Sequence, residues 1–340
     1  MMWWRLLVTV LLAAIVGLLL WDRDRVMSVL PGGATPHEAY VRSLEAAGLE
    51  DTALGRDWLA AARQALVEPE KTSLPMETTL SHTAAEPRAF GYLLDLRRGR
   101  VLNVNLSLEA EEPAHVFIDL FEVRTGDAPS AVASARRDSL TLEYEIRRDG
   151  QYIVRIQPEL LRGGDLRIGN RTTASLSFPV AGQDVSDVRS FFLDPRDAGR
   201  RQHHGVDIFA PRETPVLAAS DGIVMSAGTN RLGGNVVWVL DPARRQRQYY
   251  AHLSRQAVSG GERVSAGDVL GYVGNTGNAR GTPPHLHFGI YALQEGPIDP
   301  LPFVSGARGP QPPAVSSSPP SSPSGSAGEK PPQRSTGVGG

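Results

Sequence analysis

Two short polar segments, far apart in the chain, most constrain what this sequence can fold into. One reads His-His-Gly-Val-Asp from His203 to Asp207, and the other reads His-Leu-His from His285 to His287. A glycine inside the first and two prolines just before the second argue against helix. In extended strands, residues two and four apart share a face, so each segment turns metal-ligand side chains to one side and apolar ones to the core. Two histidine nitrogens and a carboxylate suit zinc, with a fourth position left for water.

Composition narrows the functional classes. The chain has 340 residues, room for about two domains with extensions. A net charge of −2 gives no electrostatic reason to expect a nucleic-acid partner. Cysteine is absent, which excludes disulfides, thiolate metal ligands and cysteine nucleophiles. Five of the eight histidines lie between His203 and His287, so histidine is concentrated around the proposed site.

The amino terminus, residues 1–21, is a long apolar stretch with one charge, Arg5. It approaches the roughly 20 residues that span a bilayer, and tryptophans stand at both ends, where interfacial aromatic residues belong. Two interpretations remain, an uncleaved transmembrane helix and a cleaved signal peptide. We favour the anchor because no small-residue cleavage site precedes Asp22, and in both cases we expect the rest of the chain to be exported.

Residues 22–70 are predicted to form a helical linker. Thr35 to Glu38 is a capping box with proline at the first helical position, and Gly48 closes that helix. A second helix is predicted over about 51–67, giving a helical hairpin that spaces or supports the next domain. His37 is expected to be exposed on the first helix.

In residues 71–182, apolar residues recur at every second position, which predicts a small β-sandwich-like domain. Leu140 to Ile146 and Tyr152 to Ile156 alternate around Asp149-Gly150, a pattern typical of a β-hairpin. Three roles stay open for this domain: a passive spacer, a surface that binds the cell wall or a protein regulator, or a shield over the active site.

Residues 183–304 closely resemble the lysostaphin/LytM-type zinc metallopeptidases of the M23 class. The residues that carry the resemblance are His203 to Asp207, Pro215 to Gly222, Gly233 to Asn235, Tyr250 to Leu253, Val264 to Asp268, Gly274 to Gly277, His285 to Phe288, and Asp299-Pro300. The resemblance implies an antiparallel β domain with a groove over the zinc. The expected fold class is therefore mainly β, with this domain preceded by the sandwich-like domain, the helical hairpin and the amino-terminal transmembrane helix.

The resemblance also implies residue roles. His203, Asp207 and His287 correspond to the metal ligands, and His252 and His285 to the catalytic histidines. Zinc lowers the pKa of a bound water and polarises a peptide carbonyl, while histidines titrating near neutrality can move protons or stabilise an oxyanion. The division of labour between His252 and His285 stays open.

The expected function is a zinc-dependent endopeptidase that cuts peptide cross-links between peptidoglycan stems. The expected location is the bacterial inner membrane, crossed once, with the catalytic domain in the periplasm or cell wall space. The alternative is a non-catalytic M23-type regulator that recruits another wall hydrolase. Residues 305–340 are rich in proline, serine and glycine and are predicted to be disordered.

Overall fold

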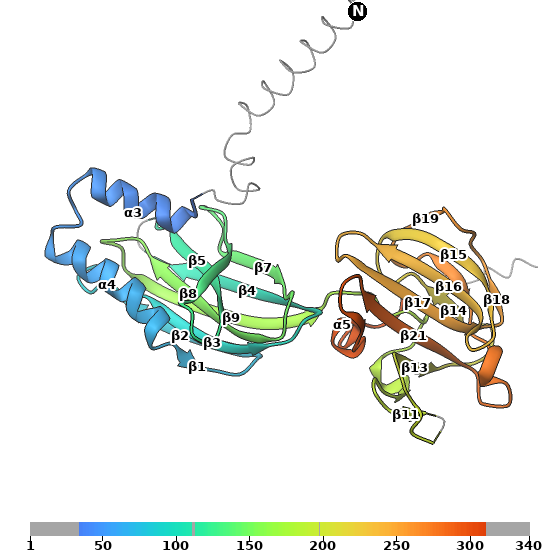
Figure 1. The fold of residues 1–340 in the computed structure, drawn as a ribbon. Helices are drawn as coiled ribbons and strands as arrows, with labels where there is room; N and C mark the ends of the chain where they lie inside the picture. The colour runs from blue at the N-terminus through green and yellow to red at the C-terminus, as the bar shows by residue number, and fades with distance from the viewer. Residues whose placement is uncertain (1–33, 111–112, 197, 311–340) are drawn as a thin grey trace, which may run out of the picture.

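The computed structural model describes residues 34–110, 113–196 and 198–310, which form two β-rich units one after the other along the chain (Figure 1). Both are built mainly from antiparallel sheets, as predicted. The apolar stretch 1–21 lies outside the described residues, as does the predicted disordered segment from 311 onward. Among the described residues, no helix is both long and apolar enough to cross a membrane.

The first unit consists of two antiparallel helices and two sheets. One sheet has the strand order β1-β3-β8-β5-β6 and the other β2-β9-β4-β7. The elements are α3 (Pro36–Ala46), α4 (Ala53–Val67), β1 (Glu70–Lys71), β2 (Met76–His82), β3 (Phe90–Leu96), β4 (Arg100–Glu109), β5 (Val116–Val123), β6 (Ser130–Ser134), β7 (Thr141–Glu145), β8 (Gly150–Pro158) and β9 (Gly164–Ala174).

The core of this unit lies between the two sheets. Alternate residues of β4, β5, β7 and β8 enter it, among them Leu102, Ile118, Leu142 and Val154. The predicted hairpin is wrong, because β7 pairs with β4 in one sheet and β8 pairs with β3 and β5 in the other. The chain passes from one sheet to the other at Gly150. Both strands alternate apolar and polar residues because each has one face on the shared core, although they belong to opposite sheets.

Helices α3 and α4 occur where the sequence predicts them and pack on the outer face of the five-stranded sheet. The predicted capping box is present at Thr35 and Glu38. Trp58 is 1% exposed, and its indole N–H donates to the carbonyl of Pro158 at 2.8 Å. The helices are thus joined to the sheet by burial and hydrogen bonding, which is a closer association than a spacer requires.

The prediction that His37 is exposed is wrong. Its side chain stacks on Trp58, lies edge-on to Phe117 and is 2.7 Å from Oε1 of Gln157. The imidazole is 5% exposed because α3 turns this side of the helix onto the sheet. Burial, followed by the nearby charge of Arg155, lowers the pKa of His37 below its ordinary value.

The lowered pKa of His37 predicts a pH-dependent stability. Below about pH 6.5, the unfolded chain binds a proton at this position more readily than the folded chain does. Folding stability should therefore fall as the pH drops from 7 towards 5, and His37→Gln, which stays neutral, should lose less over that range. Urea unfolding at several pH values measures both. His115→Gln is the control, since its side chain is 37% exposed. An unchanged pH dependence in the His37 variant would contradict the prediction.

The second unit is a long antiparallel sheet with smaller sheets beside it. The main order is β10-β13-β21-β17-β16-β15-β19, with β22 paired to β21; β14-β20-β18 and β11-β12 form the others. The elements are β10 (Val188–Ser190), β11 (Pro195–Arg196), β12 (Arg201–Gln202), β13 (Val206–Phe209), β14 (Pro215–Leu217), β15 (Gly222–Asn230), β16 (Gly234–Asp241), β17 (Gln246–Leu253), β18 (Arg255–Gln256), β19 (Arg263–Val264), β20 (Val269–Tyr272), β21 (His285–Ala292), β22 (Gly296–Ile298), the 3₁₀ turns Val185–Asp187 and Gly277–Ala279, and α5 (Leu301–Val304).

The second unit includes residues on both sides of the predicted bounds, 183 and 304. Leu176, Phe178 and Val180 are already buried in the second core, since alternate residues after β9 turn into it. At the other end, Gly309 exchanges backbone hydrogen bonds with Gly182 and Gln183. These bonds keep residues 305–309 on the second unit, although their composition predicts disorder.

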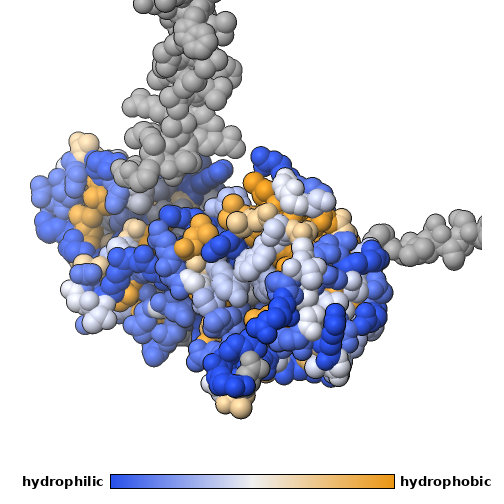
Figure 2. Space-filling model, turned by 45° about the vertical axis from the view of Figure 1, so that its right-hand side comes forward, coloured by the Kyte–Doolittle hydropathy of each residue, from blue (hydrophilic) through white to orange (hydrophobic). Residues whose placement is uncertain are grey.

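The junction between the two units contains two ion pairs and the ring of Phe303, which lies against Gly99. Arg244 pairs with Glu145 at 2.8 Å, and Arg98 pairs with Glu295 at 2.7 Å. A cleft of about 820 Å³ opens beside this junction, lined by residues of both units that include Lys71 and Arg100. Hydrophilic residues cover most of the face drawn in Figure 2, and hydrophobic residues form separate small groups there.

Candidate metal centre and active site

Strand register assembles the candidate site in the second unit. In the pairing of β13 with β21, Asp207 lies directly opposite His287. On the other side of β21, β17 places Ala251 opposite His287, so His252 comes immediately after that pair. Leu286 and Phe288 alternate with the histidines and are fully buried in the core. The alternation predicted for β21 is therefore correct, and β21 is the central strand of the site.

His203 reaches the site from a loop rather than from a strand. Strand β13 begins only at Val206, so the predicted continuous strand face from His203 to Asp207 is wrong. The short hairpin of β11 and β12 delivers His203, whose backbone N–H donates to Asp194 and whose carbonyl accepts from Leu193. Two backbone hydrogen bonds therefore fix this ligand candidate without a sheet.

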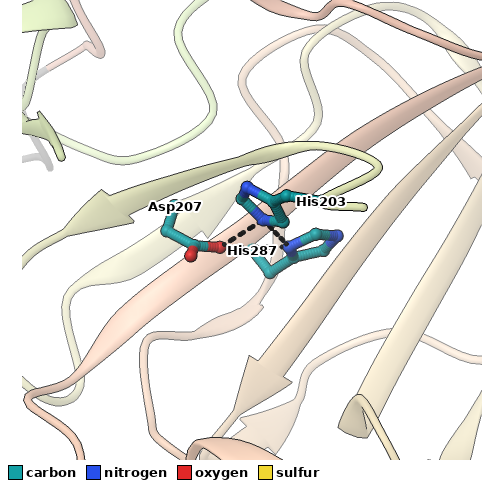
Figure 3. A group of neighbouring side chains, drawn as sticks. All are labelled: His203, Asp207 and His287. Atoms are coloured by element: carbon teal, nitrogen blue, oxygen red, sulfur yellow. Dashed lines mark hydrogen bonds and ion pairs between the residues drawn. The ribbon is translucent and has the colours of Figure 1, made fainter. Parts of the chain in front are cut away.

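Three ligand-type atoms converge at this point (Figure 3). Nε2 of His203 is 3.0 Å from Oδ1 of Asp207 and 2.9 Å from Nδ1 of His287. Nδ1 of His287 is also 3.0 Å from Oδ1 of Asp207. Three electron-pair donors facing one another this closely form the donor set that a cation would satisfy, and His₂Asp is a set that zinc takes.

The hydrogen bonds around the cluster leave the required atoms free for a metal. Nδ1 of His203 donates to the carbonyl of Phe191 at 2.8 Å, so its Nε2 carries the lone pair. Burial alone would raise the pKa of Asp207, but the hydrogen bonds and charges of His203 and His287 lower it well below its usual range. Burial lowers the pKa of His287. The ionised carboxylate and neutral imidazole are the forms that bind a metal.

His252 and His285 lie beside the cluster. The ring centroid of His252 is 5.1 Å from that of His285 and 5.9 Å from that of His287. Nδ1 of His252 is 2.9 Å from the carbonyl of Thr276, and Nδ1 of His285 is 2.9 Å from that of Pro283. A carbonyl can only accept, so each ring donates there and keeps a lone pair on Nε2.

The environment of His252 is unusual in two respects. Its φ is 65°, a left-handed conformation that is uncommon for a residue other than glycine. Its N–H donates to the carbonyl of Gly233 at 2.7 Å, which holds the backbone in place. Burial, then the charges of His287 and His285, lower the pKa of His252 to about 4, so the ring is neutral at neutral pH.

Comparison with known proteins identifies the family that the region around the candidate site matches. Residues 201–300 match the family Peptidase family M23, and the match contains all five candidate residues. This segment is an M23 peptidase domain. The matched segment begins just before His203 and ends just after the short strand β22.

Curated relatives of the M23 domain are endopeptidases. Glycyl-glycine endopeptidase ALE-1 of Staphylococcus capitis is 42% identical over 109 residues, covering 31% of this chain and 30% of that protein. The L-Ala--D-Glu endopeptidase of Bacillus subtilis is 36% identical over 139 residues, 38% of this chain and 42% of that protein. The chain thus spans well under two thirds of the relatives it matches.

A solved structure also resembles this region. The catalytic domain of lysostaphin from Staphylococcus simulans is 34% identical and covers 34% of this chain and 90% of that one, with a TM-score of 0.32.

Residues that support the site were not found from the sequence. Arg196 donates to Oδ2 of Asp207 at 2.8 Å, and Ser190 lies 3.2 Å from Nδ1 of His203. Thr276 holds His252 through its carbonyl, an atom that every residue has. Neither the spacing nor the residue type of these partners predicts their role. They reach the candidate ligands and His252 only through the folding of hairpins and loops.

Gly205 lies against the ring of the ligand candidate His287. A Cβ there would lie 2.5 Å from the carbonyl oxygen of Phe288 and 2.8 Å from the ring of His287. Gly205→Ala should therefore displace the His287 ring and lower the zinc content of the purified protein, because one of the three converging atoms moves away from the other two. Gly228→Ala is the matched control in the same domain, because a Cβ there meets nothing within 4 Å. Equal zinc content in both variants would contradict the prediction.

Proposed function

We propose that this chain is a zinc-dependent endopeptidase that hydrolyses peptide cross-links of bacterial peptidoglycan. The single observation that carries the proposal is the convergence of His203, Asp207 and His287 within 3.0 Å of one another, with His252 and His285 beside them. A domain that had lost metal chemistry would have no need to keep three ligand atoms directed at one point.

The metal ligands would be Nε2 of His203, Oδ1 of Asp207 and Nδ1 of His287. Zinc held there supplies a water of lowered pKa and polarises the peptide carbonyl. His252 and His285 each have Nδ1 committed to a backbone carbonyl, so proton transfer falls to Nε2. A neutral ring can accept the proton of the attacking water at Nε2 and return it to the leaving amine.

The substrate class is inferred from the relatives. Their printed names include a glycyl-glycine endopeptidase, an L-Ala--D-Glu endopeptidase and, in Vibrio cholerae, a peptidoglycan DD-endopeptidase that is 39% identical over 99 residues. These names specify different peptide bonds, so the proposal extends to the class of substrate and not to one bond. The apolar stretch 1–21 supports a location outside the cytoplasm, with the M23 domain held near the wall.

Purified peptidoglycan provides the direct test. The full chain, loaded with zinc, should release cross-linked peptides whose masses identify the bond, and a chelator should stop the release. His252→Ala, which leaves the three ligands intact, is the matched inactive control. Undiminished activity of metal-free protein would overturn the zinc mechanism. If zinc-loaded protein hydrolysed no peptidoglycan, the proposal that this chain is an enzyme would be overturned, and a regulator of another wall hydrolase would be favoured.

A further inference from the structure

The two carboxylate oxygens of Asp207 have different partners. Oδ1 lies 3.0 Å from both His203 Nε2 and His287 Nδ1, inside the ligand cluster. Oδ2 accepts a hydrogen bond at 2.8 Å from Nη2 of Arg196. The guanidinium thus occupies the oxygen that faces away from the cluster, which leaves one oxygen directed at the position of a metal.

The same arginine also reaches a second ligand. Its Nη2 donates to the hydroxyl oxygen of Ser190, and that oxygen is 3.2 Å from Nδ1 of His203. Ser190 is in turn 3.2 Å from Oδ2 of Asp194, whose backbone carbonyl accepts from the N–H of His203. One guanidinium therefore contacts Asp207 directly and His203 through a single hydroxyl.

Burial indicates how this contact acts. The Asp207 side chain is 13% exposed and that of Arg196 is 31% exposed, so water screens much of the charge attraction. Water screens the geometry of the hydrogen bond from Arg196 to Asp207 less than it screens the charge attraction. Because a guanidinium is always charged and planar, it can hold the carboxylate in one orientation. A carboxylate fixed through one oxygen loses the freedom to rotate or to offer both oxygens to a cation.

We propose that Arg196 is a positioning residue for the metal centre: it holds Asp207 as a one-oxygen ligand and restrains His203 through Ser190. The inference rests on the metal site of the proposed function but concerns how that site is held. Partners of metal ligands typically contribute 10–100-fold to metal affinity or activity. The effect belongs to metal binding itself, so it can be measured without any substrate.

Zinc affinity of the full chain, measured by competition with a chromophoric chelator, tests the inference. Arg196→Ala should bind zinc about 10–100-fold more weakly than the unaltered chain. Arg196→Lys, which keeps a charged donor but not the planar geometry, should recover only part of that loss. Arg255→Ala is the matched control, because Arg255 pairs with Glu213 at 3.2 Å in the same unit and both side chains are exposed. Its zinc affinity should not change.

A second measurement separates positioning from folding. Co²⁺ loaded in place of zinc gives a visible spectrum that reports ligand number and geometry, and it should differ between Arg196→Gln and the unaltered chain. Arg196→Gln preserves side-chain bulk and so replaces the alanine variant if that one fails to fold. Zinc affinity and a Co²⁺ spectrum unchanged in Arg196→Gln would overturn the inference. If the unaltered chain itself bound no zinc, the proposed function would fail first.

Discussion

His287→Ala should lose zinc and activity together, whereas His252→Ala should keep zinc and lose activity. His287 contributes one of the three converging ligand atoms, so its removal leaves only two protein ligands. His252 lies beside the cluster with its Nδ1 bound to Thr276, outside the set of converging atoms. Loss of a positioned acid–base group typically costs about 10²–10⁴-fold in rate. Zinc content and peptidoglycan hydrolysis, measured on the same preparations, separate the two.

His285→Ala should behave like His252→Ala, although it lies two residues from His287 on the same face of β21. Its ring stacks on Phe209 and its Nδ1 donates to Pro283, so it does not join the ligand cluster. Zinc lost from the His285 variant and retained in the His287 variant would show that the ligand and catalytic roles are exchanged. His204→Ala is the control, because His204 is exposed next to a ligand.

Asp119→Ala should destabilise the first unit by about 3–5 kcal/mol, the cost of leaving a buried charge without its partner. Asp119 and Arg155 form an ion pair of 2.7 Å on the sheet face beneath the helices, with side chains 3% and 9% exposed. Ser134 also donates to Asp119 at 2.6 Å. The alanine variant leaves the arginine buried without its counter-ion, which should lower the free energy of unfolding measured in urea.

Replacing both members tests the explanation. Asp119→Leu combined with Arg155→Leu removes both charges and should cost much less than Asp119→Ala, since apolar pairs of similar size often replace buried ion pairs without loss. Glu86→Ala is the control, because its pair with Arg88 is exposed on both sides and such pairs contribute about 0–1 kcal/mol. A double variant as unstable as the single one would indicate that packing, and not charge, stabilises this position.

Local pattern predicted much of the secondary structure and the residue types of the site. Helices α3 and α4 occur where capping and proline place them, and β21 shows the alternation predicted for His285 to His287. The hairpin prediction failed at Gly150 for a physical reason. A period of two shows that a strand has one buried face, but it does not show which sheet the strand joins. The exposure of His37 was wrong for a similar reason, since a short amphipathic helix does not reveal what covers its polar residues.

The sequence by itself supplied the residue types that could bind a metal, and the resemblance to the M23 class singled out His203, Asp207 and His287 among them. Alternation in an extended strand puts His285 and His287 on one face without separating the ligand from the other histidine. Only the tertiary structure decided that Asp207 lies opposite His287, that Ala251 pairs from the other side, and that the β11–β12 hairpin brings His203 and Arg196 to them. Strand register and loop placement depend on contacts between residues as many as 84 positions apart, such as His203 with His287. Such contacts form only when the whole core packs, so no local pattern in the sequence specifies them.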